Sequence, residues 1–340
     1  MLKYAIIGFG GLGKVHYRAY NEVKEKSCVE VKLVALCDIR DTTFKTQTAT
    51  NLGDSNASLD FSEYNLYNNV DALLENEELD FVVTALPTYL HAEIANKVLN
   101  HGIHVFSEKP MAISLEEAQS MLDTARKNGK KLMIGQCCRY ENKYKKLKEI
   151  IDSGKWGKVV RANFWRISPL PIWSWENWFL DEKKSGGAIL DLHVHDVDMI
   201  NYIFGMPKSV ISFATNDKTK HDSVVTRYEY DDKLITCTGE WGLPSYTYPF
   251  QSGFFVKMEK AAVEIRNGKF MLYPEGPAGS QAEEIEYPRN NDYADEVIDF
   301  VDCIANNKDS LINPPEESFN SVKIAFAEKL SSDTGERVVL

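Results

Sequence analysis

The feature that most restricts the fold is a glycine-rich stretch between a predicted strand and a predicted helix near the N-terminus. Residues 2–7 form a short apolar run, typical of a strand buried on both faces. Residues 14–23 have the pattern of a helix. Between them lies the sequence Gly8-Phe9-Gly10-Gly11-Leu12-Gly13. In this context G-x-G-x-x-G predicts a βαβ unit that binds a dinucleotide through all six of these residues.

Each glycine of this motif has a physical role in such a unit. Gly8 would permit the tight turn, Gly10 would let a pyrophosphate approach the backbone, and Gly13 would let the helix pack close to the strand. The N-terminus of the helix would favour the phosphate charge. The motif alone leaves a second interpretation open, a glycine-rich turn with no ligand.

A second predicted strand, residues 31–37, ends at an acidic residue. Asp38 stands at the distance from the glycines at which a carboxylate binds both ribose hydroxyls, which favours NAD because a carboxylate repels a 2′-phosphate. Arg40 leaves NADP possible, since a nearby arginine can accommodate that phosphate. The expected cofactor is therefore NAD, with NADP as the alternative.

Strand and helix patterns continue to alternate up to residue 134, which predicts a parallel sheet with right-handed crossovers. Ligands bind at the carboxyl ends of the strands in such sheets. The residues at two further strand ends are expected to join the cofactor site: Leu86, Pro87, Thr88, His91, Glu108, Lys109 and Pro110. Lys109 is a surface lysine paired with Glu108 in the simplest interpretation. A lysine at a strand end beside a nicotinamide could instead act on a substrate oxygen.

The segment Ala188–Asp198 concentrates acidic and imidazole side chains behind two glycines. Read as a helix, it places Asp191 and His195 on one face, so the carboxylate could orient the imidazole and raise its basicity. A structural interpretation stays open, in which Asp191 favours the helix N-terminus and both histidines are satisfied polar residues. His193 and His195 are two residues apart and do not share a helical face, so no metal site is expected.

Composition limits the class of protein. With 340 residues, 44% hydrophobic and 26% charged, the chain is expected to form two globular domains, residues 1–128 and 129–340. A net charge of −11 argues against a nucleic-acid or anionic-membrane partner. The six cysteines form no CxxC pair, and no signal peptide or membrane span is recognisable. A cytoplasmic location with reduced thiols is expected.

The second domain is predicted to be a sheet of short alternating strands between residues 158 and 273, with hairpin turns at 231–232 and 267–268. Such a sheet, covered by helices on one face only, suggests a homodimer or homotetramer formed through the other face. A loop over residues 169–187 carries tryptophans, of which Trp173 and Trp178 could stack on a sugar. Hydrophobic packing is expected for at least one of them.

These motifs together resemble a known family. GFGGLG, PTYLH, EKP and the later GGAILDLHVHDVD are similar to motifs of the glucose–fructose oxidoreductase/inositol dehydrogenase/rhizopine catabolism (Gfo/Idh/MocA) family. The resemblance implies a Rossmann domain followed by an α/β domain with a large, open, mainly antiparallel sheet. It also implies NAD(P)-dependent oxidation or reduction of a sugar, polyol or related carbonyl compound. Matched motif by motif, Lys109 takes the place of the family's catalytic lysine, His195 of its acid–base histidine and Asp191 of its paired aspartate.

The departures from the family pattern concern the substrate. Cys137 stands where an asparagine is frequent, His193 where many members have glycine, and Asp196 where the residue is often not acidic. The residues expected to line the substrate side are therefore Lys109, Cys137, Arg139, Trp173, Trp178, His193, His195 and Asp196.

The sequence thus predicts an NAD(P)-dependent oxidoreductase in which Lys109 polarises a substrate hydroxyl and His195, oriented by Asp191, exchanges its proton. Two rival functions stay open. One is a glycoside-cleaving enzyme of the same family that uses a retained NAD for transient oxidation. The other is a regulator that binds a dinucleotide without catalysis, which would have no need for all three of these side chains.

Overall fold

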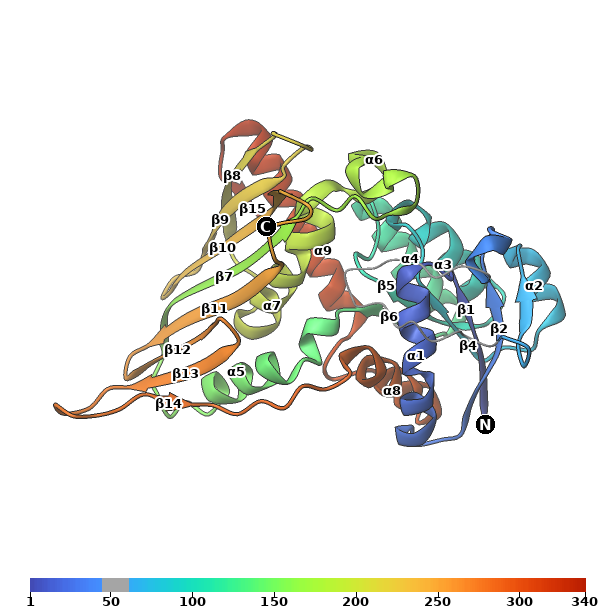
Figure 1. The fold of residues 1–340 in the computed structure, drawn as a ribbon, viewed down its shortest axis with the longest axis horizontal. Coiled ribbons are helices and arrows are strands. Elements are labelled where there is room, and N and C mark those ends of the chain that lie inside the picture. The colour runs from blue at the N-terminus through green and yellow to red at the C-terminus, as the bar shows by residue number, and fades with distance from the viewer. Residues whose placement is uncertain (45–60) are drawn as a thin grey trace. The chain divides into compact units, whose positions relative to one another are not determined.

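The computed structural model describes residues 1–44 and 61–340 and divides the chain into two compact units (Figure 1). The first unit comprises residues 1–137 and 291–319, and the second comprises 138–290 and 320–340. This division differs from the expected boundary at residue 128. The reason is that β6 (Leu132–Gly135) completes the sheet of the first unit, and α8 (Asp292–Ala305) contributes to its core.

The first unit is built on six parallel strands in the order β3-β2-β1-β4-β5-β6. The other five strands are β1 (Leu2–Ile7), β2 (Val31–Cys37), β3 (Asn65–Tyr67), β4 (Phe81–Thr84) and β5 (His104–Glu108). From β1 the successive strands are added in one direction across the sheet, and from β4 they are added in the other, so the strand order reverses between β1 and β4. This is the position at which doubly wound sheets bind ligands. The prediction of a Rossmann-type parallel sheet is confirmed.

The helices of the first unit are α1 (Gly11–Lys26), α2 (Val70–Asn76), α3 (His91–Asn100), α4 (Leu115–Asn128) and α8. Among them, α4 shows clear sequence signals at both of its ends. In α4 the Ser114 side chain accepts a hydrogen bond from the Glu117 backbone N–H at 3.2 Å, which caps the helix. Gly129 ends it in the left-handed conformation at φ 61°.

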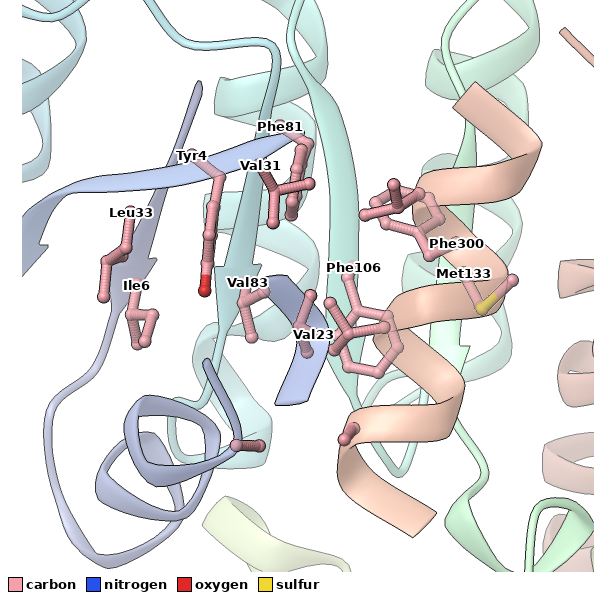
Figure 2. Packing of buried hydrophobic residues seen from close by; sticks show 14 of the residues in the cluster. Tyr4, Ile6, Val23, Val31, Leu33, Phe81, Val83, Phe106, Met133 and Phe300 are labelled. Atoms are coloured by element: carbon pink, nitrogen blue, oxygen red, sulfur yellow. The ribbon is translucent and has the colours of Figure 1, made fainter. Parts of the chain in front are cut away.

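An aromatic core joins α1 and α8 to the sheet of the first unit (Figure 2). Tyr4 stacks on Phe81 with ring centroids 4.6 Å apart. Phe300 of α8 lies edge-on to Phe81 at 5.8 Å and packs against Phe106 at 5.9 Å. Such ring pairs add to the stabilisation that comes from burying the rings. They explain why a segment from late in the sequence belongs to the N-terminal fold.

The second unit contains a sheet of nine strands in the order β14-β13-β12-β11-β7-β10-β9-β8-β15. All neighbouring strands pair antiparallel except β7 and β10, which are parallel. The strands are β7 (Val159–Pro169), β8 (Ser209–Thr215), β9 (Ser223–Glu229), β10 (Leu234–Leu243), β11 (Gln251–Met258), β12 (Ala261–Arg266), β13 (Lys269–Pro274), β14 (Glu283–Glu284) and β15 (Val338–Val339). This confirms a large, mainly antiparallel sheet.

The second unit also carries α5 (Asn142–Asp152), α6 (Glu182–Ser185), α7 (Val194–Phe204) and most of α9 (Pro315–Thr334). The predicted hairpin turn at Asn267-Gly268 joins β12 and β13, and both residues have positive φ, 51° and 77°. This is the conformation that an Asn-Gly hairpin turn requires. Within residues 1–44 and 61–340, no helix is both long and apolar enough to cross a membrane.

Candidate active site

The glycine loop follows β1 and packs tightly against its neighbours at two of its glycines. Gly8 has φ +88°, and a Cβ atom there would lie 2.4 Å from the Ala85 carbonyl oxygen. A Cβ atom on Gly13 would lie 2.0 Å from the carbonyl oxygen of Gly8. At Gly10, in contrast, the nearest atom to an added Cβ would be Arg40 Nη2 at 3.7 Å. The loop therefore has room for a ligand at Gly10 and none for side chains at Gly8 and Gly13.

Asp38 lies at the end of β2, next to the glycine loop. Its Oδ2 accepts a hydrogen bond from the Phe9 backbone N–H at 2.9 Å. Its Oδ1 accepts from the Arg40 backbone N–H at 2.9 Å and from Arg40 Nε at 3.2 Å. Asp38 favours NAD and Arg40 leaves NADP possible, and the structure shows that these two residues form an ion pair. In this pair Arg40 offsets the negative charge that would repel a 2′-phosphate.

The loop after β4 holds the next predicted cofactor residues. Leu86 and Pro87 are half-buried, whereas Thr88 is buried. His91 is buried, with Nδ1 2.7 Å from the Pro110 carbonyl oxygen and Nε2 2.8 Å from that of Leu86. Burial lowers the pKa of His91. A contact of His91 with the cofactor stays a prediction. In this structure each ring nitrogen faces a backbone carbonyl oxygen, and the ring connects two strand-end loops.

Glu108 at the end of β5 is also held inside the unit. Its Oε1 lies 2.7 Å from His16 Nε2, and its Oε2 accepts a hydrogen bond from the Lys109 backbone N–H at 3.2 Å. Both the Glu108 and the His16 side chains are buried. A cofactor contact by Glu108 stays a prediction, and in this structure its carboxylate holds the backbone that carries Lys109. His16 is a residue that the sequence analysis missed, because nothing in the helix pattern indicates its partner 92 residues away.

Lys109 is half-buried and is followed by a cis peptide bond to the buried Pro110. It lies at the same edge of the parallel sheet as the glycine loop, because β1 and β5 both flank β4 and run in the same direction. The first unit thus brings the predicted lysine and the predicted dinucleotide loop to one edge, as the strand-end argument requires.

In the second unit, Asp191 and His195 lie where the backbone changes geometry. Residues 189–193 form a π-helical turn that continues into α7. Such turns are rare and occur frequently at functional sites. Asp191 and His195 are both half-buried. The His195 Nδ1 atom lies 3.7 Å from Cys138 Sγ, a partner that the sequence analysis did not foresee.

His193 is directed into the core of the second unit. Its ring is fully buried, with Nε2 3.2 Å from Glu328 Oε2 and 3.4 Å from the Tyr228 hydroxyl. Its Nδ1 lies 3.7 Å from Cys237 Sγ. Binding of substrate hydroxyls by His193 stays a prediction, and the contacts of the ring in this structure are with the core of the second unit. His193 and His195 are two residues apart in a helical segment, so their side chains face different sides. The side that carries His193 packs on β9 and β10.

Asp196 is fully buried in an ion pair with Arg166 of β7. Arg166 Nε donates to Oδ2 at 2.8 Å and Nη2 donates to Oδ1 at 3.3 Å. The Tyr144 hydroxyl lies 3.4 Å from the same Oδ1, and burial raises the pKa of this phenol. Hydroxyl binding by Asp196 also stays a prediction, and in this structure the arginine and the tyrosine contact its carboxylate.

Arg139 forms a second buried ion pair. Its Nε and Nη2 donate to the two oxygens of Asp198 at 2.8 Å and 2.7 Å, and neither side chain is exposed. Ser321 Oγ donates to the same carboxylate at 2.8 Å. A contact of Arg139 with the substrate stays a prediction, and in this structure its guanidinium is engaged by Asp198. A bidentate pair of this kind fixes geometry, and its charges are not available to a ligand.

The substrate predictions for Trp173, Trp178 and Cys137 also stay predictions. Trp173 and Trp178 are half-buried and both pack against Phe179, with ring centroids 6.4 Å and 4.2 Å from the Phe179 ring. Packing thus accounts for part of each indole, as expected for at least one. Cys137 follows β6 and is buried.

Comparison with known proteins identifies the family. Residues 2–136 match the model of the Gfo/Idh/MocA oxidoreductase family with an NAD-binding Rossmann fold, and residues 144–264 match the C-terminal domain model of the same family. The chain is 32% identical over 238 residues to glucose-6-phosphate 3-dehydrogenase of Bacillus subtilis, which is 68% of this chain and 63% of that protein. It is 30% identical over 207 residues to inositol 2-dehydrogenase of Salmonella typhimurium, 59% of this chain and 54% of that enzyme. The matched region therefore spans less than two thirds of each of these relatives.

Solved structures of other proteins are similar to this structure over almost the whole chain. The crystal structure of an oxidoreductase from Agrobacterium radiobacter in complex with NAD⁺, L-tartaric acid and magnesium superposes with a TM-score of 0.84 at 17% identity, covering 99% of this chain and 98% of that one. The myo-inositol 2-dehydrogenase from Lactobacillus plantarum superposes with a TM-score of 0.79 at 23% identity, covering 100% and 99%. At these identities the likeness concerns the fold. Because models of both domains match in order along the chain, the protein belongs to the Gfo/Idh/MocA oxidoreductase family.

Proposed function

We propose that this protein is an NAD-dependent oxidoreductase that transfers a hydride between the nicotinamide and a CH–OH or carbonyl group of a sugar or polyol. The observation that carries the proposal is the common sheet edge of the first unit. There, the open backbone at Gly10, the Asp38 carboxylate and Lys109 all follow carboxyl ends of parallel strands. The named activities of the relatives, on glucose 6-phosphate and on inositol, support the substrate class.

The residues present fit a dinucleotide. Gly10 leaves the backbone accessible to a pyrophosphate, and the backbone N–H groups at the start of α1 favour its charge. Asp38 would accept hydrogen bonds from the ribose hydroxyls, with Arg40 giving up part of its pairing. NAD is therefore the proposed cofactor, and NADP remains the competitor because Arg40 supplies a cation at the same place.

Three side chains are assigned to the chemistry. Bound NAD would supply the hydride acceptor. The Lys109 ammonium would polarise the substrate oxygen and stabilise the charge that develops on it. His195 would take the hydroxyl proton as general base and return it in the reverse reaction, and Asp191 would orient the imidazole. The free thiol state of all six cysteines supports the further proposal of a reducing, cytoplasmic location.

The decisive experiment combines binding and turnover. Calorimetric titration with NAD, NADH, NADP and NADPH is expected to show tight binding of the NAD pair, and a sugar and polyol screen would then follow reduced nicotinamide by absorbance. His195→Asn and Lys109→Met are each expected to lower kcat by about 10²-fold or more. The matched controls, His101→Asn and Lys127→Met, change exposed residues of the first unit and should keep wild-type turnover. Absence of binding to all four nucleotides, or full turnover in both site variants, would refute the proposal.

We also propose that the protein is a homo-oligomer formed through the open face of the nine-stranded sheet. Phe213 pairs with Val225 across β8 and β9, and these side chains are 64% and 48% exposed. The residues on the opposite face, such as Cys237 and Tyr228, contact His193 in the core. An exposed apolar row of this kind is typical of an interface. Analytical ultracentrifugation would test it: Phe213→Lys should yield smaller species, and a wild-type monomer would refute it.

A further inference from the structure

Cys138 lies at the centre of a polar cluster in the second unit, which we define as Cys138, Glu141, Arg166 and His195. Cys138 and Arg166 are buried, and Glu141 and His195 are half-buried. Cys138 as a whole residue is 2% exposed. Its Sγ atom is 3.4 Å from Glu141 Oε1, 3.4 Å from Arg166 Nη2 and 3.7 Å from His195 Nδ1. These distances are within the range of hydrogen bonds that involve sulfur, so the thiol has three polar neighbours of different character.

Counting protons around the sulfur decides the direction of each bond. A thiol has one hydrogen to donate, a guanidinium can only donate, and an ionised carboxylate can only accept. Glu141 forms an ion pair with Lys143, which is consistent with an ionised acceptor. The single S–H therefore points to Glu141, and Arg166 donates an N–H to the sulfur. Toward His195 the sulfur has only lone pairs left.

We propose that Cys138 is a positioning residue that fixes His195 as the tautomer with its proton on Nδ1, which leaves the Nε2 lone pair as the proton acceptor. If the thiol were ionised, the sulfur would again be only an acceptor, and the same tautomer would result. The catalytic meaning of this assignment rests on the proposed function, whereas the tautomer itself is a property of the protein alone.

Buried groups next to the cluster hold Arg166, and with it the sulfur, in place. Arg166 is fixed by Asp196 through Nε at 2.8 Å, and its Nη2 also lies 3.4 Å from the Tyr144 hydroxyl. Because these groups are buried and interlocked, the imidazole meets an acceptor at a defined position. The sequence analysis predicts that Asp191, on the turn that precedes α7, orients the same imidazole, so the experiment must separate the two acceptors.

The tautomer can be read directly by NMR. In protein labelled with ¹⁵N-histidine, long-range ¹H–¹⁵N correlations distinguish a protonated from an unprotonated ring nitrogen, and His195→Asn assigns the His195 signals among the seven histidines. Wild-type protein without nucleotide should show a protonated Nδ1 and an unprotonated Nε2. Cys138→Ala should shift His195 toward the other tautomer, and Cys138→Ser, which retains one donor and two lone pairs, should restore the wild-type pattern.

The chain offers a matched control. Cys237 Sγ lies 3.7 Å from the Nδ1 of His193, the same kind of contact two residues earlier. Cys237→Ala should change the His193 signals and leave the His195 tautomer unchanged. Asp191→Asn tests the competing acceptor. A protonated Nε2 in the wild type would overturn the proposal. So would a tautomer that changes in Asp191→Asn but survives Cys138→Ala.

Kinetics adds the readout on function. With a substrate in hand, Cys138→Ala should lower kcat by about 10-fold to 100-fold, the range for losing a group that orients a functional imidazole, while KM changes little. Cys138→Ser should recover most of this loss. If the predicted tautomer is seen but no nucleotide binds, the proposed function fails and the tautomer assignment stands. If nucleotide binds and turnover is normal while the tautomer is wrong, the present inference fails alone.

Discussion

The glycine loop of the first unit and the segment before α7 in the second unit differ in how their residues are used. In the loop, the roles of Gly8, Gly10 and Gly13 depend on the backbone. Their surroundings follow from their position between a strand and a helix. In the second segment, His193 and Asp196 are both buried against partners far away in the sequence, Glu328 and Arg166. A site formed by the backbone can therefore be predicted from the local sequence. A site formed by side chains depends on partners that are distant in the sequence.

The buried ion pairs are the sharpest test of this contrast. Arg139→Met would leave the Asp198 carboxylate buried without its cation, and we expect a loss of about 3–5 kcal/mol in the free energy of unfolding. Arg126→Met is the matched control, because Arg126 makes an exposed pair with Glu316 that should be worth at most about 1 kcal/mol. Urea denaturation measures both. Equal effects would mean that Arg139 is not the structural residue that its burial indicates.

The glycine loop gives the next largest effect. Gly13→Ala would place a methyl group 2.0 Å from the Gly8 carbonyl oxygen, so we expect a loss of about 3 kcal/mol together with loss of nucleotide binding. Gly10→Ala is the counterpart, since its methyl group meets nothing closer than 3.7 Å. It should keep stability within about 0.5 kcal/mol and weaken only the binding. Denaturation and calorimetry of the two variants would separate packing from ligand approach. A stable Gly13→Ala protein would contradict this division.

The smallest expected effect on the free energy of unfolding comes from His104, whose ring is hydrogen-bonded to the backbone. Burial lowers the pKa of His104 in the first unit to about 4, and its Nδ1 accepts a hydrogen bond from the Lys131 backbone N–H at 2.8 Å. The folded-state pKa is below the unfolded value of about 6.5, so the unfolded chain takes up the proton first as pH falls. Between pH 7 and pH 5 this should cost up to about 2 kcal/mol of stability.

The comparison with His104→Asn isolates this contribution, because the carboxylates titrate equally in both proteins. The wild type should lose more stability than the variant between pH 7 and pH 5, as measured by urea denaturation at each pH. If the two proteins lose the same amount, the buried neutral imidazole is not responsible for the acid sensitivity.

Much of the first unit was predictable because its signals are local. The bounds of α4 follow from Ser114 and Gly129, and the parallel sheet follows from the alternation of strand and helix patterns. Short elements with weak patterns, such as β3 and α2, were not predicted. The assignment of α8 to the first unit was also beyond the sequence, because its apolar face does not show which sheet it packs against.

The sequence by itself determined the family, the parallel sheet and the set of strand ends at which a ligand binds, because glycine spacing and hydrophobic periodicity act over a few residues. Only the tertiary structure decided which polar side chains are available for chemistry. His193, Asp196 and Arg139 are withdrawn into the core, while His195 meets the thiol of Cys138. The physical reason is that a buried charge or imidazole needs a partner of the right hydrogen-bonding type, and folding brings that partner from distant segments.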